Sequence, residues 1–533
     1  MNKNNKPLTQ NIEMPAFDGS VPTELSADYI LPDTYPDVKK ILRTTARPVL
    51  IGRYISGRRL EFSGAVDYII VFCADGENGE SVHSVHFAGE WNGAVGELDD
   101  LDTAEISVTP RITACTARLA NPRKLSLRST VSADVKVRRL ASCTPRCEGA
   151  ATMEEELKLE RLTETVSSGR HRSFMAEPLR ISENLEPDSS EPPIDSIIAC
   201  KAEIRFHEAR PVSDDNGFTA ALKGTAYVDC IYKSAADSGV YRSFERKIPI
   251  SYIVSADDVS AHFENCRPDS LTARAEAIPV ELNAAVGEDN YGERRVVELD
   301  LTADVAVHIM GSEEVPLVLD MYSTERDCEC ELSDIDYTAP AKLYTSNFSV
   351  GENLSREELK LPEGASIINA TAEVTAGTLS IERGRGTLTG SAAVSCIYAD
   401  GAGGFGSAEA ALPIKYEFAA GDVNEPIAFV CGMNASDMRV RIDNDRVYFD
   451  FEVSLDAEVC EKKRRRTVNA IRLIGEPRRA LTDASMTLCY MTPGDTLWEI
   501  AKRYNTTVGA IEAANCDGGR VLMIPRRSVG IVI

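Results

Sequence analysis

The sequence predicts a mainly β protein, in which three tandem β-sandwich or barrel-like domains precede a small α+β module. Two observations carry this prediction. An alternating apolar pattern recurs three times along the 533 residues, each time after a glycine, and strict alternation is typical of a strand with one buried face. Near residue 486 the pattern changes to the order strand, helix, helix, strand, which indicates a short α+β unit.

The recurring strands begin at Gly64, Gly224 and Gly390, so successive copies start 160 and 166 residues apart. Positions 2, 4, 6 and 8 after each glycine carry small or apolar residues, the last of them aromatic. A period of two places these side chains on one face of a strand, and we expect that face in a core. The side chains are Val66, Tyr68, Ile70 and Phe72; Ala226, Val228, Cys230 and Tyr232; and Ala392, Val394, Cys396 and Tyr398.

Two further anchors accompany each glycine strand. An alternating stretch closes each copy at residues 126–135, 296–305 and 447–459, and a Pro-containing stretch with an apolar pair comes before each glycine. These anchors set three domains at residues 23–140, 172–310 and 341–462, a length that suits a β-sandwich. Residues 1–22 are expected to form an N-terminal tail. Residues 141–171, 311–340 and 463–485 are expected to be linkers, although the first stretch also fits a short helix or another strand.

Composition and charge exclude several classes of function. The net charge is -25, from 83 acidic and 58 basic residues, which disfavours a general affinity for nucleic acid. No run approaches the about 18 apolar residues of a membrane span, and the N-terminal residues lack the apolar segment of a secretory signal. We therefore expect a cytoplasmic protein. The 14 cysteines contain no C-x-x-C pair, so we expect free thiols that serve as small apolar residues.

No catalytic motif stands out. The sequence has no Gly-x-Ser-x-Gly nucleophile elbow and no phosphate loop, and its acidic residues are spread evenly. The expectation is a protein that is not an enzyme and that needs no cofactor and no metal.

The C-terminal module has clear helix signals. Thr496, with Glu499 three residues later, forms a capping box that begins a helix. Leu497, Ile500, Ala501 and Tyr504 then share one face of that helix. Thr507 is expected to cap a second helix, and Val521–Ile524 to form a closing strand that ends at Pro525.

Residues 486–530 resemble a LysM domain. The resemblance rests on Pro493-Gly-Asp-Thr-Leu-Trp-Glu-Ile-Ala501, Tyr504-Asn-Thr-Thr-Val508, Asn515 and Val521-Leu-Met-Ile-Pro525. It implies a groove for glycans that contain N-acetylglucosamine, between the loop after the first strand and the loop after the second helix. The implied binding residues are Pro493, Gly494, Asp495 and Thr496 in the first loop and Asn515 at the second, and Trp498 is a candidate for core packing or for recognition.

The second loop departs from the family pattern. Only Cys516-Asp-Gly-Gly-Arg520 lies between Asn515 and the closing strand, where family members usually have a longer stretch. The shortening removes part of the implied groove and favours a protein over a glycan as the partner of this module.

The three repeats resemble SPOCS domains, through Pro36-Asp-Val-Lys-Lys-Ile-Leu42, the glycine strands and the Ala-Asp-Val strand ends. Three such domains followed by LysM resemble the SipL-type spore coat morphogenetic proteins. The resemblance implies a scaffold in the mother cell that links coat layers to the forespore surface. Its implied partners are the spore coat morphogenetic ATPase and other coat proteins. The alternative is a protein whose LysM domain binds peptidoglycan.

A basic run stands out in this acidic chain. It consists of Lys462, Lys463, Arg464, Arg465 and Arg466. One interpretation is a solvated linker between the third repeat and the C-terminal module. The other is a docking patch for an acidic partner or an anionic membrane surface.

Overall fold

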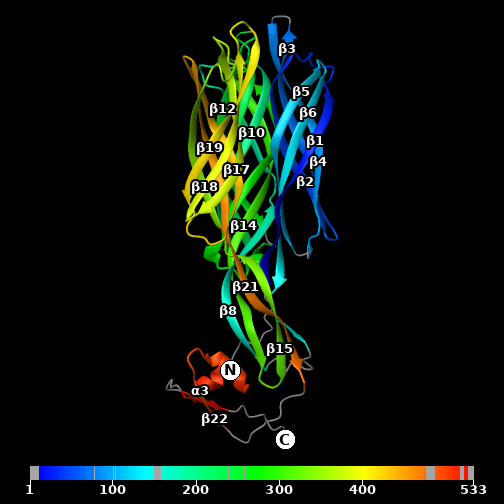
Figure 1. Cartoon of the computed structure of the whole chain (residues 1–533). Coiled ribbons are helices and arrows are strands. Elements are labelled where there is room, and N and C mark those ends of the chain that lie inside the picture. Colours follow the sequence, from blue (N-terminus) through cyan, green and yellow to red (C-terminus); the bar gives the residue numbers. More distant parts are fainter. Residues whose placement is uncertain are drawn as a thin grey trace.

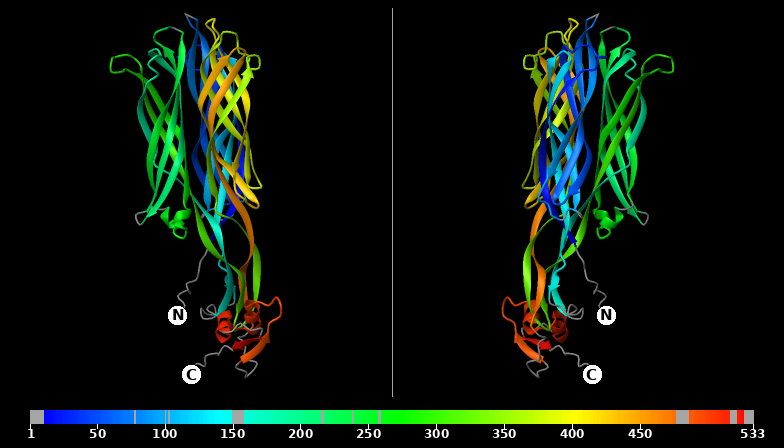
Figure 2. Two further views of the ribbon diagram at one scale, coloured as in Figure 1. Left: turned by 90° about the vertical axis from the view of Figure 1, so that its left-hand side faces the viewer. Right: turned by 90° about the vertical axis from the view of Figure 1, so that its right-hand side faces the viewer.

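The computed structural model confirms the mainly β fold class with a small C-terminal α+β module. Figures 1 and 2 show an elongated body of long strands, from which a narrower group of strands leads to the small helical module. The structure describes residues 11–76, 79–99, 101, 104–148, 158–214, 217–237, 239–256, 259–475, 486–515 and 521–525.

The first domain is a sandwich of two antiparallel sheets. One sheet has the order β1-β6-β5 and the other has the order β2-β3-β4. Its core contains the predicted face of Val66, Tyr68, Ile70 and Phe72, all of which are buried. The strands are β1 (Asn11–Ile30), β2 (Lys40–Ser56), β3 (Arg59–Gly76), β4 (Gly79–Val95), β5 (Glu105–Asn121) and β6 (Lys124–Ser142).

The second domain repeats this arrangement. A sheet of order β10-β11-β12 packs on a sheet in which β14 pairs with β13, β8 and β9. The strands are β8 (Leu159–Met175), β9 (Leu179–Leu185), β10 (Ile194–Asp214), β11 (Gly217–Ser234), β12 (Tyr241–Ala256), β13 (Thr272–Gly287) and β14 (Val296–Ser323). Two short 3-10 helices, η2 (Ser260–Phe263) and η3 (Pro268–Ser270), connect β12 to β13.

The third domain has the same topology. A sheet of order β17-β18-β19 packs on a sheet in which β21 lies between β16 and β20. The strands are β16 (Lys342–Ser355), β17 (Ser366–Glu382), β18 (Arg385–Ala399), β19 (Phe405–Ala419), β20 (Pro426–Asp443) and β21 (Arg446–Ile474). In every domain, therefore, the glycine strand is the middle strand of one sheet and the closing strand is the middle strand of the other.

Close backbone packing explains the glycine that begins the repeated pattern in the first and second domains. A Cβ atom on Gly64 would collide with the carbonyl oxygen of Val49 and with the indole of Trp91. A Cβ atom on Gly224 would collide with the carbonyl oxygen of Arg205 on the neighbouring strand. Glycine is the residue that permits such an approach between strands.

The three domains meet at one apolar junction, which the alternation of each strand does not predict. Position 7 after each glycine is Val71, Ile231 or Ile397, and each side chain points away from its own sandwich core yet is buried. These residues pack together in a single cluster, the three-domain junction, whose buried members are Leu42, Val71, Cys73, Val82, Ile231, Tyr241, Ile397 and Phe405. The cluster joins the sandwiches into one body.

A β-bulge in each domain supplies a second apolar residue to this junction. The register between the strands shifts between Ile41 and Arg43, between Ile197 and Ala199, and between Ile367 and Asn369. An inserted residue re-aims its side chain relative to the regular alternation. The inserted residues are Leu42, Ile198 and Ile368, all of which contact the junction cluster.

The segments expected to be linkers are largely strands, and the prediction of solvated connectors is wrong for the described residues. Residues 311–323 continue β14, residues 463–474 continue β21, and β15 (Asp327–Thr338) and β7 (Arg146–Glu148) pair with β21. Exposed charged side chains misled the prediction, although much of the stalk portion of β14 and β21 is buried. In β15, for example, Cys328 and Cys330 pack inward while Asp327, Glu329 and Glu331 beside them are exposed.

The N-terminal tail is a strand for the residues that are described. Residues 11–30 form β1, which pairs with β6 from Asn11↔Ser142 to Ile30↔Lys124. Ser20, Glu24, Ser26 and Asp28 are exposed, which accounts for the tail-like composition, whereas Glu13 is buried. Residues 1–10, and residues 149–157 and 476–485 of the expected linkers, lie outside the described residues.

The extended strands form a narrow stalk, which we define as residues 159–170, 311–338 and 462–474. Its interior is apolar and contains Leu159, Val318, Met321, Val468, Ile471 and Leu473. The stalk leads from the second and third domains toward the C-terminal module (Figure 1).

Candidate functional site

The C-terminal module has the predicted order of elements. They are β22 (Met486–Tyr490), α2 (Leu497–Tyr504), α3 (Val508–Ala514) and β23 (Val521–Pro525), and β22 pairs with β23. The capping box is confirmed, since Glu499 N donates to Thr496 Oγ1 at 3.2 Å and Thr496 N donates to Glu499 Oε2 at 3.1 Å. Thr507 caps α3 by accepting from Ala510 N. Ile500, Ala501, Ile511, Leu522 and Ile524 form the small core.

The first loop of the implied groove is exposed and held in shape by Asp495. Asp495 Oδ2 accepts hydrogen bonds from Thr492 N at 2.9 Å and from Thr492 Oγ1 at 2.7 Å. The backbone hydrogen bond from Thr492, followed by the side-chain one, holds the pKa of Asp495 below its ordinary value. Pro493 and Gly494 carry no such role and are open to solvent. Asp495 thus orders the loop, and the outer surface of the loop remains available to a ligand.

Asn515, the implied residue of the second loop, is occupied by bonds within the module. Its Nδ2 donates to the carbonyl oxygens of Ile511 and Met523, both at 2.7 Å, and its Oδ1 accepts from Met523 N at 2.7 Å. The side chain therefore joins the end of α3 to β23. This closure stabilises the frame of the module, and residues 516–520 lie outside the described residues.

Trp498 contacts the stalk. Its Nε1 donates to Asp320 Oδ2 at 2.8 Å, and its ring packs edge-on against Tyr322 with centroids 4.9 Å apart. Lys502 Nζ lies 2.7 Å from both oxygens of Asp320. The Tyr322 hydroxyl donates to the carbonyl oxygen of Thr506 at 2.6 Å. Of the two roles considered for Trp498, packing is therefore the one that the structure describes, and the packing is between the module and the stalk.

The contacts of Asp320 predict that this carboxylate helps to hold the module against the stalk. Asp320→Ala should leave both parts folded but loosen the C-terminal module, because Trp498 and Lys502 lose their shared acceptor while the contacts of Tyr322 remain. Two charge-assisted hydrogen bonds of this kind contribute about 2–3 kcal/mol. Hydrogen exchange should then rise in β22, α2 and around Tyr322, while the sandwich cores stay protected. Asp300→Ala, at an exposed position of β14, is the matched control, and equal exchange in both variants would contradict the prediction.

The two-stranded sheet of the module presents a second surface, an apolar face. Leu488 lies opposite Met523 and Tyr490 lies opposite Val521 in the register of β22 and β23. Leu488 is 59% exposed and Tyr490 is 72% exposed. The full face consists of Met486, Leu488, Tyr490, Val521 and Met523, and exposed apolar patches mark interaction sites. The alternation of β22 could have predicted this face, since Cys489 is buried between two exposed apolar neighbours.

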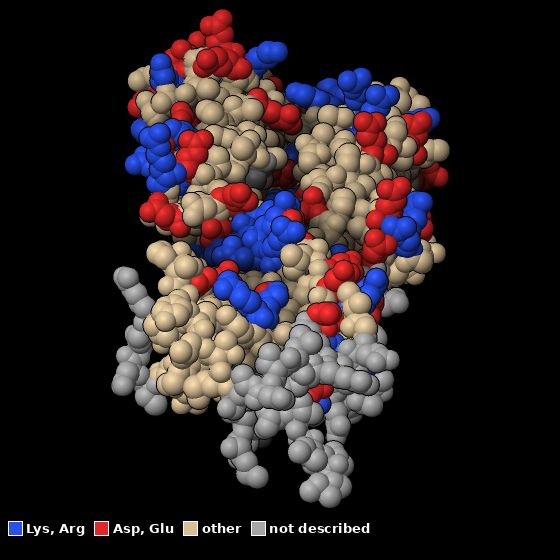
Figure 3. Space-filling view, turned by 60° about the horizontal axis from the view of Figure 1, so that its bottom comes forward, with Lys and Arg blue, Asp and Glu red and all other residues tan. Residues whose placement is uncertain are grey.

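The basic run is part of β21 in the stalk, so the linker interpretation of residues 462–466 is wrong. Lys462 and Arg464 both pair with Asp336 on β15, at 3.3 Å and 2.5 Å. Lys463 pairs with Glu461 at 3.2 Å, and Arg465 pairs with Glu164 at 3.6 Å. Figure 3 shows basic and acidic side chains side by side at this end of the molecule. Arg466 is exposed, and the local pairs neutralise much of the charge that a docking patch would offer.

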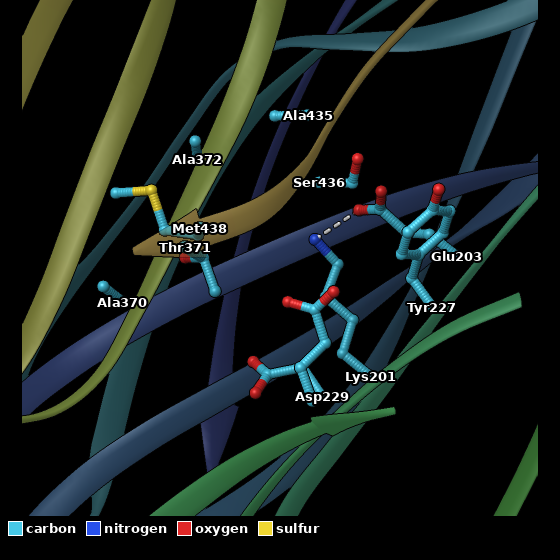
Figure 4. Close-up of a pocket in the computed structure, with 11 residues that line it drawn as sticks. Lys201, Glu203, Tyr227, Asp229, Ala370, Thr371, Ala372, Ala435, Ser436 and Met438 are labelled. Carbon is cyan, nitrogen blue, oxygen red and sulfur yellow. Dashed lines mark ion pairs between the residues drawn. The ribbon is translucent and has the colours of Figure 1, made fainter. Parts of the chain in front are cut away.

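The cavities between domains are lined by charged residues that sequence reasoning missed. A small cavity of 60 Å³ lies between the second and third domains, and Figure 4 shows Lys201 pointing toward Glu203 there, 2.7 Å away. Asp229, on the same wall, accepts from Asn369 Nδ2 at 2.9 Å. Burial, with Asp437 and Asp229 nearby, raises the pKa of Glu245 to about 7. A larger cavity of 670 Å³ is lined by all three domains. Lys201 also lies 3.8 Å from Glu373 of the third domain, and no local sequence pattern predicts such a pair across domains.

The described residues contain neither a cluster of metal ligands nor a helix that could span a membrane. No group of three or more His, Cys, Asp or Glu side chains among them is placed to hold a metal ion. None of their helices has the length and apolar content needed to cross a membrane.

Comparisons with known proteins identify one domain. A family model described as LysM domain matches residues 492–520, so this part of the chain is a LysM domain. No curated protein matches the chain. No solved structure matches it either.

Proposed function

We propose that the protein is a non-enzymatic scaffold whose LysM domain binds a glycan that contains N-acetylglucosamine, such as peptidoglycan. The observation that carries this proposal is the LysM domain itself, with its first loop open to solvent. The module contacts the stalk through Trp498, Lys502 and Thr506, and these contacts leave residues 492–494 uncovered. The three sandwiches, joined at the three-domain junction, then serve as the body that holds the module in place.

A titration of the full chain with chitin oligomers and with muropeptides tests this function. The wild-type chain should bind with saturation below millimolar concentration. Asp495→Ala should weaken binding by about tenfold, because it removes the two hydrogen bonds that order the loop. Arg503→Gln, which removes only the 3.5 Å ion pair to Asp495, is the matched control and should bind as the wild type does. Absence of saturable binding by the wild-type chain would overturn the glycan proposal.

A second candidate function is protein docking during endospore coat assembly. The apolar face of β22 and β23 supports it, since such a face fits another protein better than a sugar chain. In this candidate the scaffold acts in the mother cell at the forespore surface, and the spore coat morphogenetic ATPase or another coat protein covers the apolar face. The resemblance of the three repeats to SPOCS domains points to the same setting.

The apolar face also separates the two candidates. Leu488→Ser with Tyr490→Ser should abolish capture of the purified coat ATPase while glycan titration stays unchanged. The Asp495→Ala variant should show the reverse pattern. Capture that survives the double substitution would exclude the apolar face as the docking surface.

A further inference from the structure

Two cysteines face each other across adjacent strands of the second domain. In the register of β10 and β11, Cys200 is directly paired with Cys230, and the two Sγ atoms lie 2.7 Å apart. Directly opposed residues of an antiparallel pair have Cα atoms about 4.5 or 5.5 Å apart. Both separations fall within the range of about 4.4–6.8 Å that a disulfide requires. The backbone thus already has the geometry that a covalent bond between these residues needs.

The pair is specific to the second domain. At the equivalent positions the first domain pairs Thr44 with Ile70, and the third domain pairs Ala370 with Cys396. Cys396 therefore provides a buried thiol in the same structural position without a thiol partner on the neighbouring strand. The strand pattern alone makes Cys230 and Cys396 equivalent, because each takes the place of Ile70, and the strand register distinguishes them.

We propose that Cys200 and Cys230 form a reversible intramolecular disulfide when the protein meets a low-molecular-weight disulfide such as oxidised glutathione. Cys200 is the partly exposed member, and Cys230 is fully buried. The Cys200 thiolate attacks one sulfur of the small disulfide, forms a mixed disulfide and releases one small thiolate. Cys230 then attacks Cys200 Sγ and displaces the second small thiolate, which takes up the proton of Cys230, while the first small thiolate takes up the proton that Cys200 lost to solvent. One small disulfide is reduced to two thiols for each protein disulfide formed.

The order of the two steps follows from the environment of each thiol. The hydrogen bond with Cys200, together with burial, raises the pKa of Cys230 well above its ordinary value. Cys230 therefore stays protonated, and it reacts only after Cys200 has formed the mixed disulfide. Burial likewise raises the pKa of Cys396, to about 11. Because Cys396 has Ala370 and no cysteine opposite it on β17, the second step cannot occur there.

The bond would fasten the part of the second domain that reaches the three-domain junction. Ile231, a junction residue, follows Cys230 directly, and the inserted residue Ile198 lies two positions before Cys200. A covalent link between β10 and β11 at this point holds the bulge in register with its neighbour. The oxidised protein should therefore open less readily at the junction than the reduced protein.

A peptide map of the native full-length chain tests the proposal. The reduced protein is exposed to oxidised glutathione, alkylated and digested without reductant, and the fragments are analysed by mass spectrometry. The expected product is one linked fragment that contains Cys200 and Cys230, lighter than the sum of the two free fragments by about 2 Da, because two hydrogens leave. The link should disappear on treatment with excess dithiothreitol.

Three variants make the result decisive. In Cys230→Ser, Cys200 should accumulate as a stable glutathione adduct, and in Cys200→Ser, Cys230 should stay unmodified. Ala370→Cys should create a second linked fragment with Cys396, which is unlinked in the wild type. A wild-type map in which Cys200 carries glutathione and Cys230 stays free, or in which neither reacts, would overturn the proposal.

Discussion

Replacing Glu458 with glutamine is expected to lower the free energy of unfolding by about 3 kcal/mol. The carboxylate is 4% exposed and lies where all three domains meet, within reach of Arg138, Lys136 and His171 at 3.2, 3.9 and 3.4 Å. Removing one partner of a buried ion pair costs about 3–5 kcal/mol, because the remaining charges stay buried without compensation. Glu13 also contacts His171 and Arg138, so these two cations keep one carboxylate partner in the variant. We therefore expect a loss at the lower end of that range.

The effect should depend on pH, and its sign follows from the pKa shifts in the network. Burial acts to raise the pKa of Glu458, but His171, Lys136 and Arg138 hold it well below its ordinary value. Burial and Arg138 act to lower the pKa of His171, but Glu13 and Glu458 hold it above its ordinary value. A lowered carboxylate pKa contributes stability that is lost as pH falls. A raised histidine pKa contributes stability that is lost as pH rises through it.

The difference between wild type and Glu458→Gln should therefore be widest between the unfolded-state pKa values of Glu and His, about pH 4.5 to 6.5. It should narrow as pH rises through the raised pKa of His171, because the neutral imidazole no longer attracts Glu458. Urea denaturation at a series of pH values measures this difference. Glu417→Gln, at an exposed pair with Arg385 of 2.9 Å, is the control and should leave the stability near that of the wild type at every pH, because exposed ion pairs contribute little. If the difference in unfolding free energy does not vary with pH, His171 does not contribute to the network.

Placing a carboxylate in the three-domain junction is the second change with a large expected effect. Ile397 is 1% exposed and packs against residues of the other two domains. Ile397→Asp should destabilise the assembled body by about 4 kcal/mol or more, because an unpaired charge is buried in an apolar cluster. The core of the third domain should persist, since Cys396 and Tyr398 face the other way into it.

The measurement for this variant must distinguish separation of the domains from unfolding. Small-angle scattering should report a larger radius of gyration, while circular dichroism keeps the β signal of the wild type. Val71→Asp and Ile231→Asp, at the equivalent positions of the other domains, should act in the same way. Ile253→Asp, at a position of β12 that is 73% exposed, is the control and should change neither quantity. A compact Ile397→Asp variant would show that the junction does not hold the domains together.

The sequence predicted those strands and helices that depend on residues only a few positions apart. Alternation predicted the buried face of β3, β11 and β18, because side chains of a strand point to opposite faces in turn. Thr496 and Glu499 predicted the start of α2, because a capping box depends on residues three positions apart. The LysM domain was recognisable for the same reason, since its strands, caps and helices all lie within about 40 residues.

The expected linkers illustrate where local reasoning failed. Residues 311–323 and 463–474 were assigned to linkers on their charge, yet they continue β14 and β21 into the stalk. Both strands bury many of these residues, while charged side chains such as Glu314 and Arg472 stay exposed and resemble those of a connector. The basic run has acidic partners that come from β15 and β8, far from it in sequence.

By itself, the sequence determined the period of each strand, the helix caps, the three-fold repetition and the LysM domain. The tertiary structure decided which outward faces are buried and which charges are neutralised. Val71, Ile231 and Ile397 lie on the face that alternation assigns to solvent, and they are buried because three sandwiches share one junction. Trp498 binds Asp320, which is 178 residues away in the sequence. Such contacts depend on which surfaces meet after folding, and the local periodicity of the sequence does not predict them.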